Sequence, residues 1–142
     1  MSKKTKLEAI TTQTTQAEME NALRQAMIKF EYDFMGRGPT EVRAFIVRDM
    51  IIVRLKGVLT PAERQLAKTE EGIGMVKQMR QNLLMQGRGQ LIKQVENITG
   101  ATPTALFTDI DVRAGERMIV LTLDRDVSKS LSRRRISLAS ND

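Results

Sequence analysis

Two carboxylates at alternate positions are the part of this sequence closest to a catalytic or metal-binding pattern. Asp109 and Asp111 share one face of a predicted strand, where a third ligand would complete a site for a hard cation. The chain has no cysteine and no histidine, which excludes thiol chemistry, Ser-His-Asp nucleophiles and the usual zinc ligand sets. Solvated strand-end residues are therefore the favoured interpretation, and an Asp-based metal-dependent enzyme is the least favoured function.

Residues 36–40 read GRGPT, and their two glycines invite comparison with an anion-binding loop. The segment lacks the Gly-Lys-Ser/Thr ending of a phosphate loop and precedes a strand instead of a helix. Gly36, Gly38 and Pro39 are therefore interpreted as a structural turn. A small-ligand or nucleotide sensor that uses this turn is the alternative function, and no cofactor is predicted.

The clearest local signal in the chain is Thr60, Pro61 and Glu63. A threonine N-cap, a proline at the first helical position and a glutamate three residues after the cap together predict a capping box. Glu63 beside Arg64 also resembles an acid and its partner, but capping already explains the glutamate. The nine methionines could form an adaptable docking groove, but their spacing favours packing in the core.

The net charge of +6 lies almost entirely at the two ends of the chain. Residues 1–14 and 128–142 carry five of these six charges, so the body has no basic face that predicts specific nucleic-acid binding. Besides a solvated tail, the C-terminal segment suits peripheral contact with an anionic membrane or with phosphates. The residues concerned are Lys129, Arg133, Arg134 and Arg135.

The remaining sequence predicts helices and two hairpins. Apolar residues at helical spacing predict a helix over residues 15–35, and β-branched runs predict a hairpin with strands 42–47 and 50–55. A short helix from Thr60 precedes one long helix or two shorter ones over residues 73–98, with a kink or weak point expected at Gly87 and Gly89. Residues 105–111 and 118–123 predict the second hairpin.

This order predicts an α+β domain, in which helices cover one face of a four-stranded antiparallel sheet. We expect a flexible segment over residues 1–14, one domain over residues 15–127 and a disordered tail over residues 128–142. The other sheet face carries more apolar area than water usually meets, which predicts a homodimer contact. The residues that define this face are Arg43, Phe45, Val47, Ile52 and Arg54.

Four stretches resemble the MpsC family of small bacterial proteins, also called YbcI-like. They are GRGPTEVRAFIVRDMIIVRLKGVLTPAERQLAKT, VKQMRQNL, the ITG before the second hairpin, and TDIDVRAGERMIVLTLD, which together span about residues 17–124. The resemblance implies association with a sodium-translocating, membrane-potential-generating system whose membrane partners look like inorganic-carbon transport proteins. It carries over no catalytic residue. The matching residues, taken as candidates for structure or interaction, are Asp49, Arg54, Gly57, Thr60, Pro61, Glu63, Arg64 and Asp109.

These observations predict a non-enzymatic accessory or regulatory protein that docks a partner, with a membrane ion or inorganic-carbon transport complex as the expected partner. The docking surface is expected around the first hairpin and the start of the Thr60 helix. The basic N-terminal residues lack the apolar core of a secretory signal, which predicts a cytoplasmic protein. The basic C-terminal tail adds the expectation of a peripheral location at the inner face of the plasma membrane.

Overall fold

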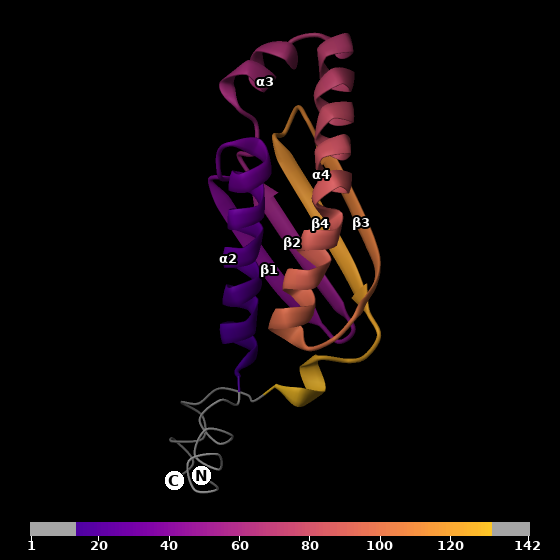
Figure 1. The fold of residues 1–142 in the computed structure, drawn as a ribbon. Helices are drawn as coiled ribbons and strands as arrows, with labels where there is room; N and C mark the ends of the chain where they lie inside the picture. Colours follow the sequence, from indigo (N-terminus) through magenta and orange to yellow (C-terminus); the bar gives the residue numbers. More distant parts are fainter. Residues whose placement is uncertain (1–13, 132–142) are drawn as a thin grey trace, which may run out of the picture.

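A computed structural model describes residues 14–131 as two long helices and two short ones with a four-stranded sheet (Figure 1). The elements in order are α2 (Gln16–Met35), β1 (Glu41–Val47), β2 (Met50–Lys56), α3 (Pro61–Leu66), α4 (Glu70–Thr99), β3 (Pro103–Asp111), β4 (Glu116–Leu123) and the 3₁₀ turn η1 (Ser128–Ser130). The predicted α+β class, the two hairpins and the N-terminal helix are confirmed.

The sheet is antiparallel throughout, with strand order β1-β2-β4-β3. Each hairpin pairs its own strands, and β2 joins the hairpins by pairing with β4. The hairpin strands β1 and β3 are therefore the two edges. Because β2 and β4 form the centre, residues 60 to 72 positions apart in the chain become neighbours in the middle of the sheet.

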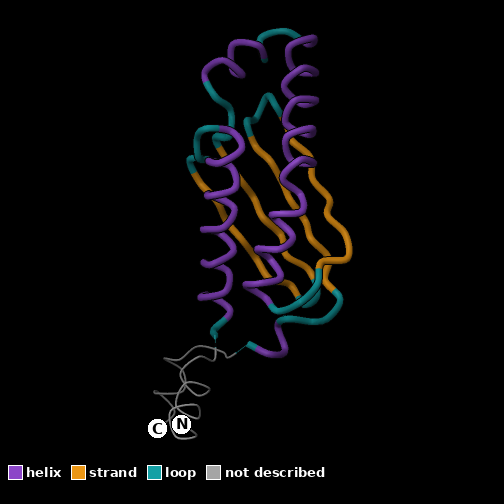
Figure 2. The backbone as a smooth tube through the Cα atoms, in the orientation of Figure 1, coloured by secondary structure: helices purple, strands orange, loops and turns teal. Residues whose placement is uncertain are grey.

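Helices α2 and α4 lie side by side over one face of the sheet, and within residues 14–131 no helix lies on the opposite face (Figures 1 and 2). Helix α2 packs against β1, and α4 packs against α2 and β3. The predicted inward positions of the first hairpin are buried, because alternate strand residues point to the covered face. The strand residues in this core include Val42, Ala44, Ile46, Ile51, Val53, Leu55, Ile119 and Leu121.

Each long helix begins at a threonine whose hydroxyl accepts a backbone N–H and ends at a glycine. Thr15 accepts the Glu18 N–H, and Thr69 accepts the Gly72 N–H. Gly36 and Gly100 close the two helices in the left-handed conformation, at φ of 76° and 72°. This conformation costs glycine little, which is why the chain can turn sharply at both points.

The expected kink at residues 87–89 is wrong, because α4 runs without interruption from Glu70 to Thr99. Gly87 is buried where α2 crosses, and a Cβ there would lie 2.7 Å from the ring of Phe34 and 2.8 Å from that of Phe30. These two rings stack with centroids 4.7 Å apart. Gly87 is therefore a contact point that lets two aromatic rings reach the helix backbone.

Residues 128–131, placed in the C-terminal tail by the sequence, form η1 and a following bend. Val127 is buried, its N–H bonds to the Arg48 carbonyl, and Leu131 packs against the core. Lys129 is exposed within η1. The predicted tail contacts Arg133, Arg134 and Arg135 lie outside the described residues, as does most of the predicted flexible N-terminal segment.

Candidate interaction surface and buried ion network

The uncovered sheet face carries an apolar row that crosses all four strands. Phe45 of β1 pairs with Ile52 of β2, which pairs in turn with Val120 of β4. Val120 also pairs with Phe107 of β3. Phe45 and Phe107 are 44% and 60% exposed. A sheet face that meets water normally presents polar residues, so this row of four side chains, here called the apolar row, is typical of a contact surface.

Toward the β3–β4 turn, the same face becomes charged, with opposite signs on its two halves. The β1–β2 half carries Glu41, Arg43, Arg54 and Lys56, and the β4–β3 half carries Glu116, Asp109 and Asp111. Arg54 forms an ion pair with Glu116 across the middle, which lowers the pKa of the Glu116 carboxyl. Three basic groups and Glu41 therefore lie on one side of the sheet midline, and three acidic groups lie on the other.

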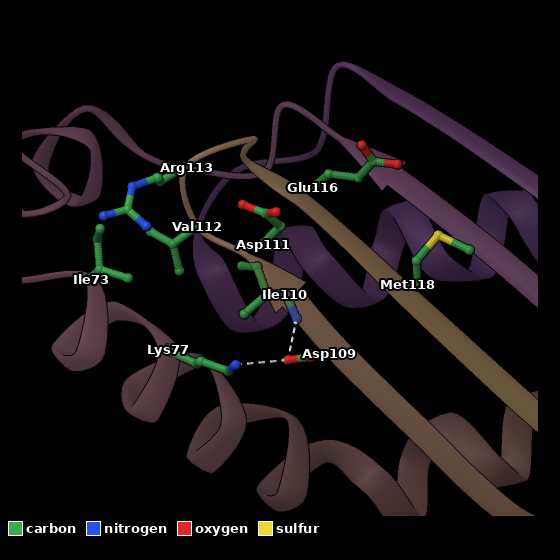
Figure 3. A pocket seen from close by; sticks show the side chains of 9 residues that line it. All are labelled: Ile73, Lys77, Asp109, Ile110, Asp111, Val112, Arg113, Glu116 and Met118. Carbon is green, nitrogen blue, oxygen red and sulfur yellow. Dashed lines mark hydrogen bonds and ion pairs between the residues drawn. The ribbon is translucent and has the colours of Figure 1, made fainter. Parts of the chain in front are cut away.

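A shallow hollow of about 470 Å³ lies where this charged half meets the first turns of α4 (Figure 3). Its sheet side is lined by Asp109, Asp111, Glu116 and Met118, and its helix side by Ile73 and Lys77. The remaining lining residues, Ile110, Val112 and Arg113, come from the end of β3 and the turn after it.

The two carboxylates singled out in the sequence line this hollow but are already bonded within the protein. The Asp109 carboxylate accepts the Ile110 N–H at 2.8 Å and pairs with Lys77 at 3.2 Å, and these contacts lower its pKa. Asp111 accepts the Ala114 N–H at 3.0 Å, as an aspartate before a turn commonly does. Among residues 14–131, no three acidic side chains gather in a way that would hold a metal ion.

Beneath the opposite face, a buried ion network joins three helices. The Arg80 side chain of α4 is fully buried and donates to both carboxylate oxygens of Glu63, from Nε at 2.7 Å and from Nη2 at 2.8 Å. It also donates to the Val58 carbonyl at 2.5 Å and to Glu31 of α2 at 3.3 Å. A guanidinium has a planar fork of donors, and here nearly every direction of that fork meets an acceptor.

A second buried arginine, Arg117 of β4, completes the charge balance of this network. Burial lowers the pKa of Arg117, and the nearby Glu31 carboxylate opposes that effect. The Arg117 Nη1 bonds to the Thr108 hydroxyl at 3.4 Å, whereas its buried Nε meets no hydrogen-bond partner among the described residues. Two arginines and two glutamates are therefore enclosed in the core, with Arg80 well bonded and Arg117 held mainly by charge.

The pKa values of the two buried glutamates shift in opposite directions. Burial raises the pKa of Glu31 above its ordinary value of 4.5, because Arg117 and Arg80 only partly offset it. Burial also disfavours the charged form of Glu63, but the hydrogen bonds from Arg80 and the Thr60 N–H outweigh it and lower the pKa. The structure therefore favours ionised Glu63 and penalises ionised Glu31.

We predict opposite pH dependences for Glu63→Gln and Glu31→Gln. The folded protein binds the Glu63 proton more weakly than the unfolded chain, so the advantage of wild type over Glu63→Gln is present above pH 4.5 and is lost as the pH falls further. The advantage over Glu31→Gln is greatest below pH 4.5 and declines as the pH rises above it. Urea unfolding of the three proteins across this range measures both slopes, and equal signs would contradict the assignment.

The turn candidates serve the connections on either side of the first hairpin. Within residues 36–40, the Gly36 N–H bonds to the Tyr32 carbonyl and the Thr40 N–H to the Lys56 carbonyl, each at 2.9 Å. Gly38 and Pro39 lie half-buried between them. Gly57 has a φ of 62°, and a Cβ there would lie 2.2 Å from the Thr40 hydroxyl. These residues thus pack against one another as a structural junction.

Other sequence candidates take roles in helix capping and strand connection. The predicted capping box is confirmed: the Thr60 hydroxyl accepts the Glu63 N–H, and the Glu63 carboxylate accepts the Thr60 N–H. Pro61 opens α3, and Arg64 is exposed on it. Asp49, in the β1–β2 turn, uses its carbonyl to accept the Leu123 N–H at 2.8 Å.

Sequence reasoning missed Glu31, Arg80 and Arg117, although their positions held a signal. Arg80 lies four residues after Val76 and four before Leu84, on the buried stripe of α4. Arg117 alternates with Ile119 on the buried side of β4. A charged residue at a core position requires a partner inside the protein, and this rule would have marked both arginines.

The expectation that most methionines pack in the core is wrong for the described part of the chain. Only Met19 and Met27 are buried there, whereas Met75, Met79 and Met85 of α4 are among the most exposed apolar residues. Met75 and Met79 line a shallow surface with Leu83 at helical spacing. Helix α4 therefore presents a second apolar stripe on the opposite side of the molecule from the apolar row.

Comparison with known proteins places this fold in a family. Residues 15–125 match the family model described as "Na+-translocating membrane potential-generating system (MpsC)". The chain belongs to the MpsC family. It is 37% identical over 119 residues to the uncharacterized protein YbcI of Bacillus subtilis (strain 168), which covers 84% of this chain and 96% of YbcI. It is also 28% identical over 102 residues to the uncharacterized protein YrhF of the same organism, covering 71% of this chain and 84% of YrhF. No solved structure matches.

The MpsC match covers the apolar row, the charged end of the sheet and the buried ion network, since all three lie between residues 31 and 120. The family description names a sodium-translocating membrane system and no enzymatic reaction. Within residues 14–131 of this MpsC-family chain, no helix combines the length and apolar character needed to cross a bilayer.

Proposed function

We propose that this protein is a non-enzymatic accessory or regulatory component that works by binding other proteins through its uncovered sheet face. The observation that carries this proposal is the apolar row. Phe45, Ile52, Val120 and Phe107 form a band across the full width of the sheet, bordered by charged residues on one side. A partly apolar surface with a charged border is the usual composition of a protein contact.

The family description, a sodium-translocating and membrane potential-generating system, supports a membrane ion-transport complex as the setting in which this binding takes place. Inorganic carbon is part of the proposal as the cargo that the resemblance implies for such a complex. Under this proposal the chain acts at the inner face of the plasma membrane. The basic C-terminal residues supply an electrostatic attraction to anionic lipid of about 1 kcal/mol for each lysine or arginine near the surface.

Recovery of partners from solubilised membranes tests the proposal. Tagged full-length protein, Phe107→Ser and Met85→Ser are purified in mild detergent, and the co-purifying transport subunits are quantified by mass spectrometry. Phe107 and Met85 are 60% and 57% exposed, so neither change should disturb folding, which circular dichroism checks. We expect wild type and Met85→Ser to recover transport subunits equally, and Phe107→Ser to lose most of that recovery.

The outcomes separate the parts of the proposal. Equal recovery by all three proteins would show that the sheet face is not the contact surface. If wild type recovers no transport subunit, the transport complex is ruled out as the partner. A chain ending at Leu131 tests the basic tail in the same assay, since it should shift protein from the membrane to the soluble fraction.

A further inference from the structure

The charged end of the sheet face has an arrangement that fits a second copy of itself. Its basic residues lie on β1 and β2, and its acidic residues other than Glu41 lie on β4 and β3, as described above. A two-fold axis parallel to the strands and midway between β2 and β4 exchanges these halves when two sheets are stacked face to face. Each row of residues across the sheet then meets the same row of the other copy in reverse order.

We infer that the uncovered face binds a second copy of this chain about such an axis, giving a two-layer, eight-stranded sandwich with the helices outside. The inference rests on the proposed function: the second copy covers the face on which that function depends, and the transport partners then bind the paired chains, so a variant that breaks the pair also loses them. Stacked sheets commonly keep their strand directions within about 30° of each other, and this axis preserves that alignment. The same surface serves both copies, as a two-fold interface requires.

The apolar row meets itself under this operation. Phe45 faces the second copy's Phe107, and Ile52 faces the second copy's Val120, so four apolar pairs form across the interface. The row beyond it places Val47 over the second copy's Ala105. Covering these side chains removes the largest apolar exposure on the sheet from water.

The charged rows also meet favourable partners. Arg43 faces the second copy's Asp109, and Lys56 faces the second copy's Glu116. Arg43 would thus extend toward the hollow lined by Asp109, Asp111 and Glu116, which gives that hollow an occupant of the right charge (Figure 3). The one like-charged meeting, Glu41 over Asp111, falls at a corner where Arg43 and Lys56 already neutralise Glu41, at 3.5 and 3.9 Å.

The other two-fold axis that keeps the strands aligned runs across them, and it produces mismatched rows wherever it lies. Midway along the face it places the row of Arg43 and Arg54 over the row of Phe45 and Ile52. Along the apolar row it places the row of Arg43 and Arg54 over that of Val47 and Met50, so in both positions charged groups would be covered by apolar side chains. Burying a charge without a partner is costly, which disfavours this arrangement. The pattern of the face therefore specifies the axis as well as the contact.

A charge exchange tests both the second copy and the axis. Sedimentation velocity of the full-length protein over roughly 1–100 μM, which covers the weak end of the affinities of standard-size interfaces, should show a dimer. Arg43→Asp and Asp109→Arg should each weaken dimerisation at least about tenfold, since each change places like charges together twice in the symmetric dimer. The double variant should recover wild-type affinity to within about threefold, because each aspartate at position 43 then faces an arginine at position 109.

Lys93→Asp is the matched control, because it reverses one exposed charge on α4, away from the sheet face, and should leave dimerisation unchanged. A wild-type chain that stays monomeric at the highest concentration would overturn the inference. Two weakened single variants without recovery in the double variant would overturn the axis. Circular dichroism of every variant separates lost folding from lost association.

Crosslinking gives the geometry independently, since the chain contains no cysteine. Val47 and Ala105 lie on the two edge strands, about 14 Å apart within one sheet, but face each other across the proposed interface. A short bismaleimide should join Val47→Cys to Ala105→Cys when the two proteins are mixed, and should join neither to itself. Self-crosslinking of either protein, or no product from the mixture, would contradict the arrangement.

Failure of this inference and failure of the proposed function give different results. A monomeric chain whose Phe107→Ser variant still loses its membrane partners would overturn the second copy and leave the proposed function in place. A wild-type dimer whose Phe107→Ser variant keeps those partners would support the second copy and overturn the proposed function.

Discussion

Replacing Arg80 with alanine is expected to lower the free energy of unfolding by about 3–5 kcal/mol, a large share of the 5–15 kcal/mol typical of a domain. The side chain is fully buried and is the common partner of Glu63, Glu31 and the Val58 carbonyl. Its removal leaves two carboxylates in the core facing only Arg117, together with a cavity where the long side chain was. Urea unfolding measures the loss.

Two further variants show whether charge or hydrogen-bond geometry matters more at this position. Arg80→Lys keeps the positive charge but cannot reproduce the two bonds to Glu63, so its stability should lie between wild type and Arg80→Ala. Arg88→Ala, two turns further along α4 and only half-buried, is the control and should change stability by less than about 0.5 kcal/mol. A loss below about 1 kcal/mol for Arg80→Ala would show that water reaches the network.

Gly72→Ala is expected to destabilise the protein by at least about 3 kcal/mol, although glycine to alanine usually strengthens a helix by about 1 kcal/mol. Gly72 lies in the first turn of α4, and a Cβ on it would fall 1.7 Å from the Leu66 carbonyl oxygen. That oxygen belongs to the backbone at the end of α3, so it cannot swing aside as a side chain could. The substitution would force α3 and α4 apart.

The other glycines of α4 are built-in controls for this prediction. A Cβ on Gly74 or Gly89 would meet no atom of residues 14–131 within 4 Å, so alanine at either position should stabilise the protein by about 0.5–1 kcal/mol. Gly87→Ala should destabilise less than Gly72→Ala, because the Phe30 and Phe34 rings it meets can partly shift. Thermal unfolding of the four variants gives the order directly, and a stabilised Gly72→Ala would contradict the close approach of α3.

The uncovered sheet face connects these core features to the proposed role. The ion network ties α2, α3 and α4 together on the covered side, so the helical layer is bonded internally through Arg80. The opposite face is left to make contacts outside the protomer. The apolar row supplies the hydrophobic area of that contact, and the opposite charges on the two halves of the face set the orientation of the bound partner.

Local residue patterns determined much of this fold without help from the tertiary structure. The capping box of Thr60 and Glu63 depends on atoms three residues apart, so sequence alone specifies where α3 begins. The alternation in residues 42–55 likewise fixes both strands, their turn and the side that is buried. The exposure of Phe45 and Val47 followed from the same alternation.

The tertiary structure decided what depends on residues far apart in the chain. The partners of Arg80 come from positions 17 and 49 residues away, so no local spacing could assign them. Helix α4 continues through Gly87 because two aromatic rings of α2 pack against it there. This packing offsets the loss of stability that glycine normally causes inside a helix. The apolar row exists only because β2 pairs with β4 in one particular register. Each hairpin alone carries half of that row, and only pairing between the hairpins joins the halves into one surface.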